Sequence, residues 1–238
     1  QAAHSDAHRP LELSFEQKKL YKADLSFMGA AYHNRVQSFP RLLDMDFKIW
    51  GTGWDLDSPL GKRVQNDNKR VSTDETVNIY NAAKINLNLH SSLYHYGINP
   101  HGDFVNPRTF EIASCKGFQL LDNRSDLLNL FNVDEELVVF NSLDELKDQI
   151  IFYIANPDKR NEIANRSYQR VLAEHTIVHR MQELLIHVFI NRVDSIQKNE
   201  ASRLDPLSYF IEKAGRDTTL GEYLGEFEGT KKFSLKTL

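Results

Sequence analysis

A short stretch near the middle of the chain combines a charged pair with the start signals of a helix. Arg108 and Glu111 are three residues apart, so a helix would place both on one face. Asn106 suits the N-cap, because its side-chain oxygen can accept from free amides of the first turn, and Pro107 suits the first helical position. A helix N-terminus beside an arginine favours a phosphate group. A solvated salt bridge between the two charges is the simpler alternative.

The end of this helix is also marked in the sequence. Gly117 is expected to adopt the left-handed conformation that ends a helix, and Lys116 suits the negative end of the helix dipole. Residues 118–121 form a short apolar run that predicts a buried strand. Cys115 is the one cysteine, and we expect a small buried helix residue rather than a nucleophile.

Apolar strand-like runs alternate with helical patterns over most of the chain. This alternation predicts an α/β fold with a Rossmann-like parallel sheet and helices on both faces. We place this domain at residues 23–194, after a polar connector at 1–22 with a short helical pattern at 15–21. A helix capped by Thr73 or Asp74 and a short helix at 126–131 are among the predicted elements. Residues 195–238 form a polar, partly helical C-terminal extension.

The run at residues 106–122 resembles the CgeB-like (spore maturation protein type) glycosyltransferases. It reads Asn-Pro-Arg-Thr-Phe-Glu-Ile-Ala-Ser-Cys-Lys-Gly-Phe-Gln-Leu-Leu-Asp. Residues 24–29 resemble the first strand and glycine turn of that family, residues 83–90 a middle strand, and residues 174–181 the closing helix. The resemblance covers roughly 23–193 and implies the C-terminal, donor-binding domain of a bacterial GT-B enzyme, that is, one half of a GT-B fold.

The resemblance also implies roles for two acidic residues. Many retaining GT-B enzymes carry two acids with seven residues between them, of which the second grips the ribose and the first lies near the donor sugar. Asp103 and Glu111 have this separation, although the usual first acid is Glu rather than Asp. Glu111 is therefore the expected ribose acceptor, and Asp103 is the one candidate for a catalytic role.

A nucleotide-sugar donor also needs cations and backbone amides around its diphosphate. In a doubly wound sheet these groups come from the loops outside the carboxyl ends of the strands. Arg35, Lys62 and Arg108 are the candidate cations. The residues predicted to bind the donor are Gly29, Arg35, Lys62, Asp103, Asn106, Arg108, Thr109 and Glu111.

Composition excludes several other classes of function. The net charge of −4 gives no support to nucleic-acid binding, and one cysteine cannot form an internal disulfide or a cysteine-based zinc site. His90, His95 and His101 have a spacing that matches no metal motif, so we expect no metal and no cofactor. No apolar run is long enough to span a membrane and no signal peptide opens the chain, which favours a cytoplasmic location.

The sequence therefore predicts a metal-independent, hexosyltransferase-like glycosyltransferase domain that binds a nucleotide-diphosphate sugar for transfer to an acceptor. The missing initiator methionine suggests a fragment or processed chain, and we expect an N-terminal acceptor-binding domain outside it. The alternative is a non-catalytic α/β module that binds a nucleotide or a protein partner. The sugar, the base, the acceptor and the stereochemical outcome stay open at this point.

Overall fold

A five-stranded parallel sheet forms the centre of the fold, with strand order β2-β1-β3-β4-β5. The computed structural model describes residues 1–200, 206–226 and 228. The strands are β1 (Ala23–Met28), β2 (Phe47–Trp50), β3 (Ala83–Asn88), β4 (Gln119–Asp122) and β5 (Val138–Phe140). The chain runs outward from β1 to β2 and then returns to β3. The winding direction therefore reverses between β1 and β3, where sheets of this kind bind ligands.

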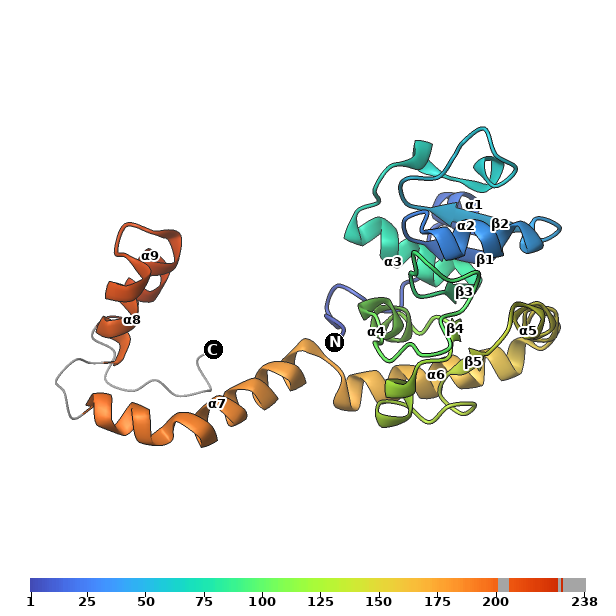
Figure 1. Cartoon of the computed structure of the whole chain (residues 1–238). Helices are drawn as coiled ribbons and strands as arrows, with labels where there is room; N and C mark the ends of the chain where they lie inside the picture. The colour runs from blue at the N-terminus through green and yellow to red at the C-terminus, as the bar shows by residue number, and fades with distance from the viewer. Residues whose placement is uncertain (201–205, 227, 229–238) are drawn as a thin grey trace. The chain divides into compact units, whose positions relative to one another are not determined.

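Helices cover both faces of the sheet (Figure 1). Residues of the short 3₁₀ helix η1 (Phe39–Leu42), which directly follows α2 (His33–Ser38), and of α5 (Leu143–Ala155) pack on one face. Residues of α1 (Phe15–Tyr21), α3 (Thr73–Ala82) and α4 (Pro107–Ser114) pack on the other. The long helix α6 (Pro157–Glu174) contributes Ile163 to the first side and Val171 to the second. The predicted α/β fold with helices on both faces is confirmed.

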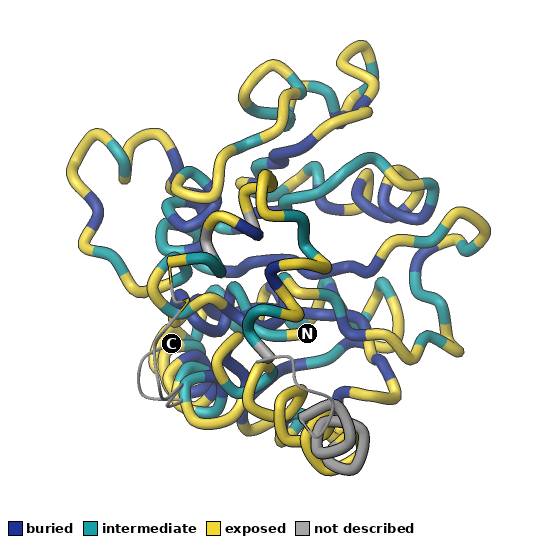
Figure 2. The backbone as a smooth tube through the Cα atoms, turned by 90° about the vertical axis from the view of Figure 1, so that its left-hand side faces the viewer, coloured by how far each residue is buried: buried dark blue, intermediate teal, exposed yellow. Residues whose placement is uncertain are grey.

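Burial follows this layering. Figure 2 shows the strands as mostly buried segments surrounded by exposed loops. All four residues of β4 are buried, because both faces of the sheet are covered. Leu25 and Phe27 of β1 point to the same face and join one apolar cluster, with Phe39 and Phe47 around them. Hydrophobic burial therefore fixes the sheet on which the loops are held.

The chain divides into two compact units, Gln1–Arg180 and Met181–Leu238. The first holds the sheet and the remaining 3₁₀ helices, η2 (Gly61–Arg63), η3 (Asn66–Asn68) and η4 (Ser125–Asn129). The helix α7 (Ile177–Glu200) begins in the first unit, and α8 (Pro206–Ala214) and α9 (Thr219–Gly225) contact each other in the second. The boundary predicted at residue 194 lies within α7 and stays a prediction. Among the described residues, no helix has both the length and the apolar character needed to cross a membrane.

Local details differ from the sequence prediction at two helices. Ser72, rather than Thr73 or Asp74, caps α3, because its side chain accepts from the backbone N–H of Glu75. The helix predicted at 126–131 is the 3₁₀ helix η4, which begins at Ser125. The first difference concerns which of three adjacent polar residues caps the helix, and the second concerns the type and the bounds of a short helix.

The end of α4 corrects the expectation for Gly117. Lys116, not Gly117, adopts the left-handed backbone conformation, with a φ of 57°. Gly117 is required for a different reason. A Cβ at this position would lie 3.0 Å from both Asn86 Nδ2 and Ile112 Cγ2, so these neighbours would have to shift. The glycine therefore allows α4 to approach the sheet closely.

Two substitutions should separate these roles. Lys116→Gly should raise the free energy of unfolding by about 1 kcal/mol, because glycine adopts a positive φ without steric cost. Gly117→Ala should lower it, because the added methyl group meets Asn86 and Ile112. Urea denaturation measures both. A destabilised Lys116→Gly variant would show that the left-handed residue is assigned wrongly.

Candidate functional site

A pocket of about 430 Å³ lies outside the carboxyl ends of the central strands. Its position agrees with the point where the winding of the sheet reverses. Among the predicted donor-binding residues, Arg35, Asp103, Asn106 and Arg108 line it. The other lining residues are Ala30, Tyr32, His90, Ser91, Asn99, His101, Gly102, Phe104 and Arg124.

Two guanidinium groups meet at one edge of this pocket, beside Gly29. A Cβ built on Gly29 would lie 3.2 Å from Arg35 Nη1 and 3.2 Å from Arg108 Nη2, so a side chain here would crowd both guanidinium groups. In the described part of the chain, every hydrogen-bond partner of the two groups is uncharged. Burial, and then the charge of Arg108, lower the pKa of Arg35 to about 9. Arg35 is still protonated at neutral pH, so the pair favours an anionic ligand.

Arg35 also ties the ends of two strands together. Its Nε and Nη2 donate to the carbonyl of Leu89 at 3.1 and 2.8 Å, and its Nη1 donates to the carbonyl of Ala30 at 3.0 Å. These carbonyls belong to the loops that follow β3 and β1. The guanidinium carbon lies 4.9 Å from the centre of the Phe27 ring. Arg35 thus combines a structural role with a positive charge at the pocket.

Arg108 keeps an unused donor in a buried position. Its Nε is buried without a hydrogen-bond partner, and so is the Tyr80 hydroxyl of α3. Burial raises the pKa of Tyr80, the charge of Arg108 acts to lower it, and the charge of Glu111 raises it, so the three groups are near neighbours. A buried polar group without a partner costs about 1–3 kcal/mol. Such groups need an explanation, and an oxygen of a bound ligand or water is one.

Glu111 is half-buried on the same helix, beside Tyr80 and Cys115. Its carboxylate makes no hydrogen bond or ion pair within the described residues, so no salt bridge to Arg108 forms. Burial, followed by the charge of Glu111, raises the pKa of Cys115 to about 12. Cys115 is therefore an inert buried thiol, as expected.

Buried amides hold the start of α4 against the sheet. Asn106 caps the helix by accepting from the Thr109 N–H at 3.2 Å, and its Nδ2 donates to Asn88 Oδ1 at 2.8 Å. Asn88 Nδ2 donates to Thr109 Oγ1 at 2.9 Å. Gln119 Nε2 donates to the Thr109 carbonyl at 2.8 Å. Thr109 is fully buried by these contacts and anchors the helix, while Asn106 and Arg108 face the pocket.

A second buried network links the end of β4 to the start of α4. The Asp122 carboxylate accepts from the backbone N–H and the ring Nδ1 of His90, both at 2.8 Å, and it pairs with Arg124. His90 Nε2 accepts the backbone N–H of Asn106 at 3.0 Å. These two bonds require the neutral tautomer with its hydrogen on Nδ1. Burial lowers the pKa of His90, in agreement with a neutral ring.

The charge state of Asp122 follows from the same contacts. Burial acts to raise the pKa of the carboxyl, but the hydrogen bonds from His90 and the charge of Arg124 together hold it below its usual range. Arg124 has a second feature, because its Nε is buried without a partner. Gly102 lies directly over this guanidinium, where any side chain would collide with it. The loop that carries Asp103 therefore packs against the Arg124 side chain.

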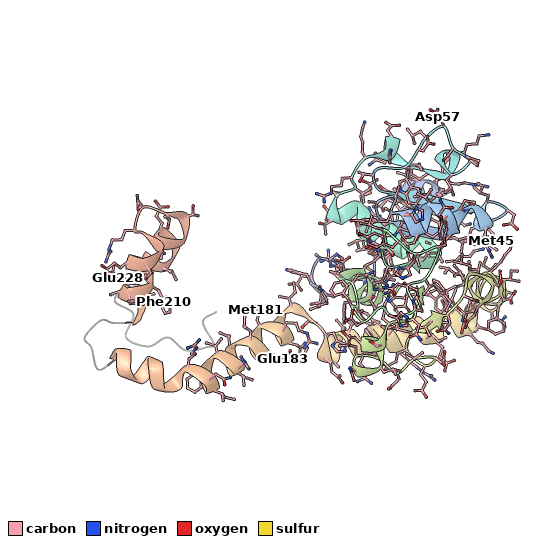
Figure 3. All side chains as sticks on the ribbon, viewed as in Figure 1. Met45, Asp57, Met181, Glu183, Phe210 and Glu228 are labelled. Carbon is pink, nitrogen blue, oxygen red and sulfur yellow. The ribbon has the colours of Figure 1, made fainter. Side chains whose placement is uncertain are left out.

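Asp103 and Lys62 lie further from the arginine pair. Asp103 is exposed at the pocket, where its Oδ1 accepts from the N–H of Phe104 at 2.6 Å. Lys62 is exposed in η2 and does not line the pocket. It belongs to the segment between β2 and α3, whose Asp57 extends from the outer edge of the sheet unit (Figure 3). The structure thus brings together Gly29, Arg35, Asn106 and Arg108, with Glu111 beside Arg108, but not Lys62.

Four residues of the site were not among the predicted set: Tyr80, His90, Asp122 and Arg124. Three of them follow directly from strand position, because His90 stands just after β3, Asp122 ends β4 and Arg124 comes two residues later. Ligand-proximal groups are expected there in such a sheet. Within the described ranges, no three His, Cys, Asp or Glu side chains are arranged to hold a metal ion.

The His90 network makes a pH-dependent contribution to stability. His90→Ala should lower the free energy of unfolding at neutral pH by about 1–3 kcal/mol, because the partners of a buried donor and acceptor are lost. Since the pKa of His90 is lowered in the folded state, the unfolded chain takes up the proton first as the pH falls.

The stability that His90 supplies is therefore complete above the ordinary histidine pKa and is lost below it. Urea unfolding should be measured from about pH 8 to about pH 5. The difference in the free energy of unfolding between wild type and His90→Ala should become smaller as the pH falls. Exposed His101 serves as the control, and His101→Ala should change the free energy of unfolding little at neutral pH. If the stability lost in His90→Ala does not change with pH, His90 does not stabilise the fold as a neutral ring.

Comparison with known proteins agrees with the fold and the resemblance. CgeB, a spore protein of Bacillus subtilis (strain 168), is 29% identical over 167 residues, which are 66% of this chain and 51% of CgeB. This chain therefore spans about half the length of that relative. The predicted resemblance to CgeB is confirmed.

Solved structures with the same fold include a single glycosyltransferase domain and a longer chain. The C-terminal domain of the group 1 glycosyltransferase LpcC from Francisella tularensis aligns with a TM-score of 0.55 and 15% identity, over 74% of this chain and 99% of that one. Anabaena Alr3699/HepE in complex with UDP aligns with a TM-score of 0.60 and 10% identity, over 79% of this chain and 55% of that chain. These identities establish the fold alone.

The family comparison covers four of the five strands of the sheet and most of the pocket. The family model described as glycosyl transferase-like matches residues 33–186, which include α2, β3, the pocket loop and all of α4. Because the match covers more than half of the chain, this protein is a member of the glycosyl transferase-like family.

Proposed function

We propose that the pocket binds the diphosphate of a nucleotide-sugar donor, and that this chain is the donor-binding half of a glycosyltransferase. The observation that carries the proposal is the meeting of Arg35 and Arg108 at Gly29 without a carboxylate partner in the described residues. A diphosphate would neutralise both charges, and one of its oxygens could accept from the unused Nε of Arg108. Family membership supports the sugar-transfer chemistry.

The neighbouring groups fit the rest of such a ligand. Glu111, which has no partner among the described side chains, would accept hydrogen bonds from the ribose hydroxyls. Asp103 would lie toward the donor sugar, on the loop seated over Arg124. Uridine diphosphate is the first ligand to test, because Alr3699/HepE has been solved in complex with UDP and with UDP-glucose.

Charge stabilisation at this pocket would assist departure of the diphosphate. As the bond to the sugar breaks, negative charge grows on the phosphate, and fixed guanidinium groups stabilise it without reorganising. We propose that these groups take the place of a divalent ion. Binding of the diphosphate should then be unchanged by excess chelator.

The acceptor is proposed to bind to another domain. This chain spans 51% of the length of CgeB and 55% of HepE, which supports a second half outside it. Transfer needs donor and acceptor held together, so the chain alone should bind the donor and transfer little sugar. A non-catalytic nucleotide-binding module would still show no transfer when the second half is restored.

The arginine pair can be tested by titration calorimetry with UDP and with uridine. Arg108→Gln should weaken UDP binding by about 1.5–3 kcal/mol, typical of hydrogen bonds to charged groups, and should leave uridine binding nearly unchanged. Arg41→Gln removes the same charge from an exposed residue paired with Asp144, and should affect neither ligand.

Lys62→Gln decides whether the loop after β2 takes part in binding. Because Lys62 lies outside the pocket, its effect on UDP binding should be smaller than that of Arg108→Gln. If Arg108→Gln and Arg41→Gln lose UDP affinity equally, the loss reflects the net charge of the protein. That result would contradict a specific diphosphate site.

The ribose assignment has its own test. Glu111→Gln should weaken the binding of both uridine and UDP by about 1.5–3 kcal/mol, because both ligands carry the ribose. The free energy of unfolding should change little, since the carboxylate has no partner among the described residues that it could lose. Unchanged affinity for both ligands would remove Glu111 from the site.

A further inference from the structure

A second hollow, of about 830 Å³, lies at the opposite edge of the sheet from the donor pocket. We call it the lysine hollow, and its lining includes Lys18, Lys19, Lys22, Lys84, Leu11 and Phe15. Lys22 immediately precedes β1, and Lys84 is the second residue of β3. The hollow therefore lies at the amino ends of the same parallel strands whose carboxyl ends carry the pocket. Nothing in the proposed donor chemistry accounts for it.

One face of α1 supplies most of its charge. Phe15, Lys18, Lys19 and Lys22 follow the spacing i, i+3, i+4 and i+7, so they share a face of the helix. Tyr21 points the other way and is buried. Lys18, Lys19 and Lys22 are exposed, and in the part of the chain that the structure describes their ammonium groups have no carboxylate partner.

The hollow is a local excess of positive charge on an acidic protein. Lys84 pairs with Asp24 at 2.6 Å, and Glu12 is the one acidic lining residue. The whole chain carries a net charge of −4. Electrostatic attraction to an anionic surface would therefore come from this patch and would orient the molecule, rather than attract it in any orientation.

An exposed aromatic ring accompanies the lysines. Phe15, which lines the hollow, is 77% exposed. A partner recognised by charge alone gains nothing from an exposed phenylalanine, whereas an anionic lipid surface can use both groups. Ammonium groups contact lipid phosphates, and an aromatic side chain enters the boundary between headgroups and acyl chains.

We propose that the lysine hollow docks this protein onto an anionic phospholipid surface. The three free lysines contact the phosphates, Phe15 enters the boundary layer, and Leu11 lies against the apolar part of the headgroup region. Docking through this edge leaves the donor pocket accessible, because the six residues of β1 separate the two edges by about 20 Å.

Vesicle sedimentation with the full chain tests this proposal without any nucleotide. Vesicles of phosphatidylglycerol and phosphatidylcholine in equal parts should bind the chain at low salt, and pure phosphatidylcholine should not. Lys18→Gln/Lys19→Gln/Lys22→Gln should bind on the order of 100-fold more weakly. The control Lys69→Gln/Lys147→Gln/Lys159→Gln loses the same charge elsewhere on the Gln1–Arg180 unit and should bind like wild type.

Two further measurements separate a membrane from other anions. Phe15→Ser keeps every lysine and should still weaken vesicle binding, whereas binding of a soluble anion would not change. Circular dichroism verifies that each variant is folded. The proposal is overturned if both triple variants lose binding equally, if Phe15→Ser binds like wild type, or if anionic vesicles do not bind. It is also overturned if polyglutamate or glycerol phosphate competes fully for the hollow, because the partner would then be a soluble anion.

Discussion

The fully buried carboxylate of Asp122 sets the geometry of the candidate site. It holds His90 by two hydrogen bonds, and His90 in turn accepts the N–H of Asn106 at the start of α4. The direction of that helix start decides where Arg108 points. A buried carboxylate is stable only when its partners are complete, so the network has little freedom to rearrange. A connection between the ends of two strands and one helix thus positions a charge at the pocket.

The positive charge at the pocket is less well compensated than the negative one. Arg35 offsets part of the cost of its burial with three hydrogen bonds to carbonyl groups, but no carboxylate among the described residues is hydrogen-bonded to it or to Arg108. Burying one guanidinium beside another is unfavourable in the absence of an anion. Perturbed charges of this kind concentrate at functional sites, where a ligand supplies the missing partner. The binding free energy of an anion would therefore include relief of this repulsion.

Local signals were enough to predict the main elements. A few adjacent residues are enough to predict the start of α4 at Asn106–Pro107 and the strand at Phe47–Trp50. The left-handed Lys116 was not predictable, because it accompanies the close approach of Gly117 to Asn86, which belongs to the earlier strand β3. Likewise, Glu111 could be singled out by its separation from Asp103, but its position beside Tyr80 depends on how α3 packs against α4. Lys62 is one cation of the right type whose loop does not reach the pocket.

The most direct test is a crystal structure of this chain with uridine diphosphate. The account predicts that phosphate oxygens lie beside Gly29, within hydrogen-bond distance of Arg108 Nε and of Arg35 Nη1, and that the ribose hydroxyls contact Glu111. His90 should still accept the N–H of Asn106 in that complex. A diphosphate bound away from Gly29, or bound there without either arginine, would contradict the account.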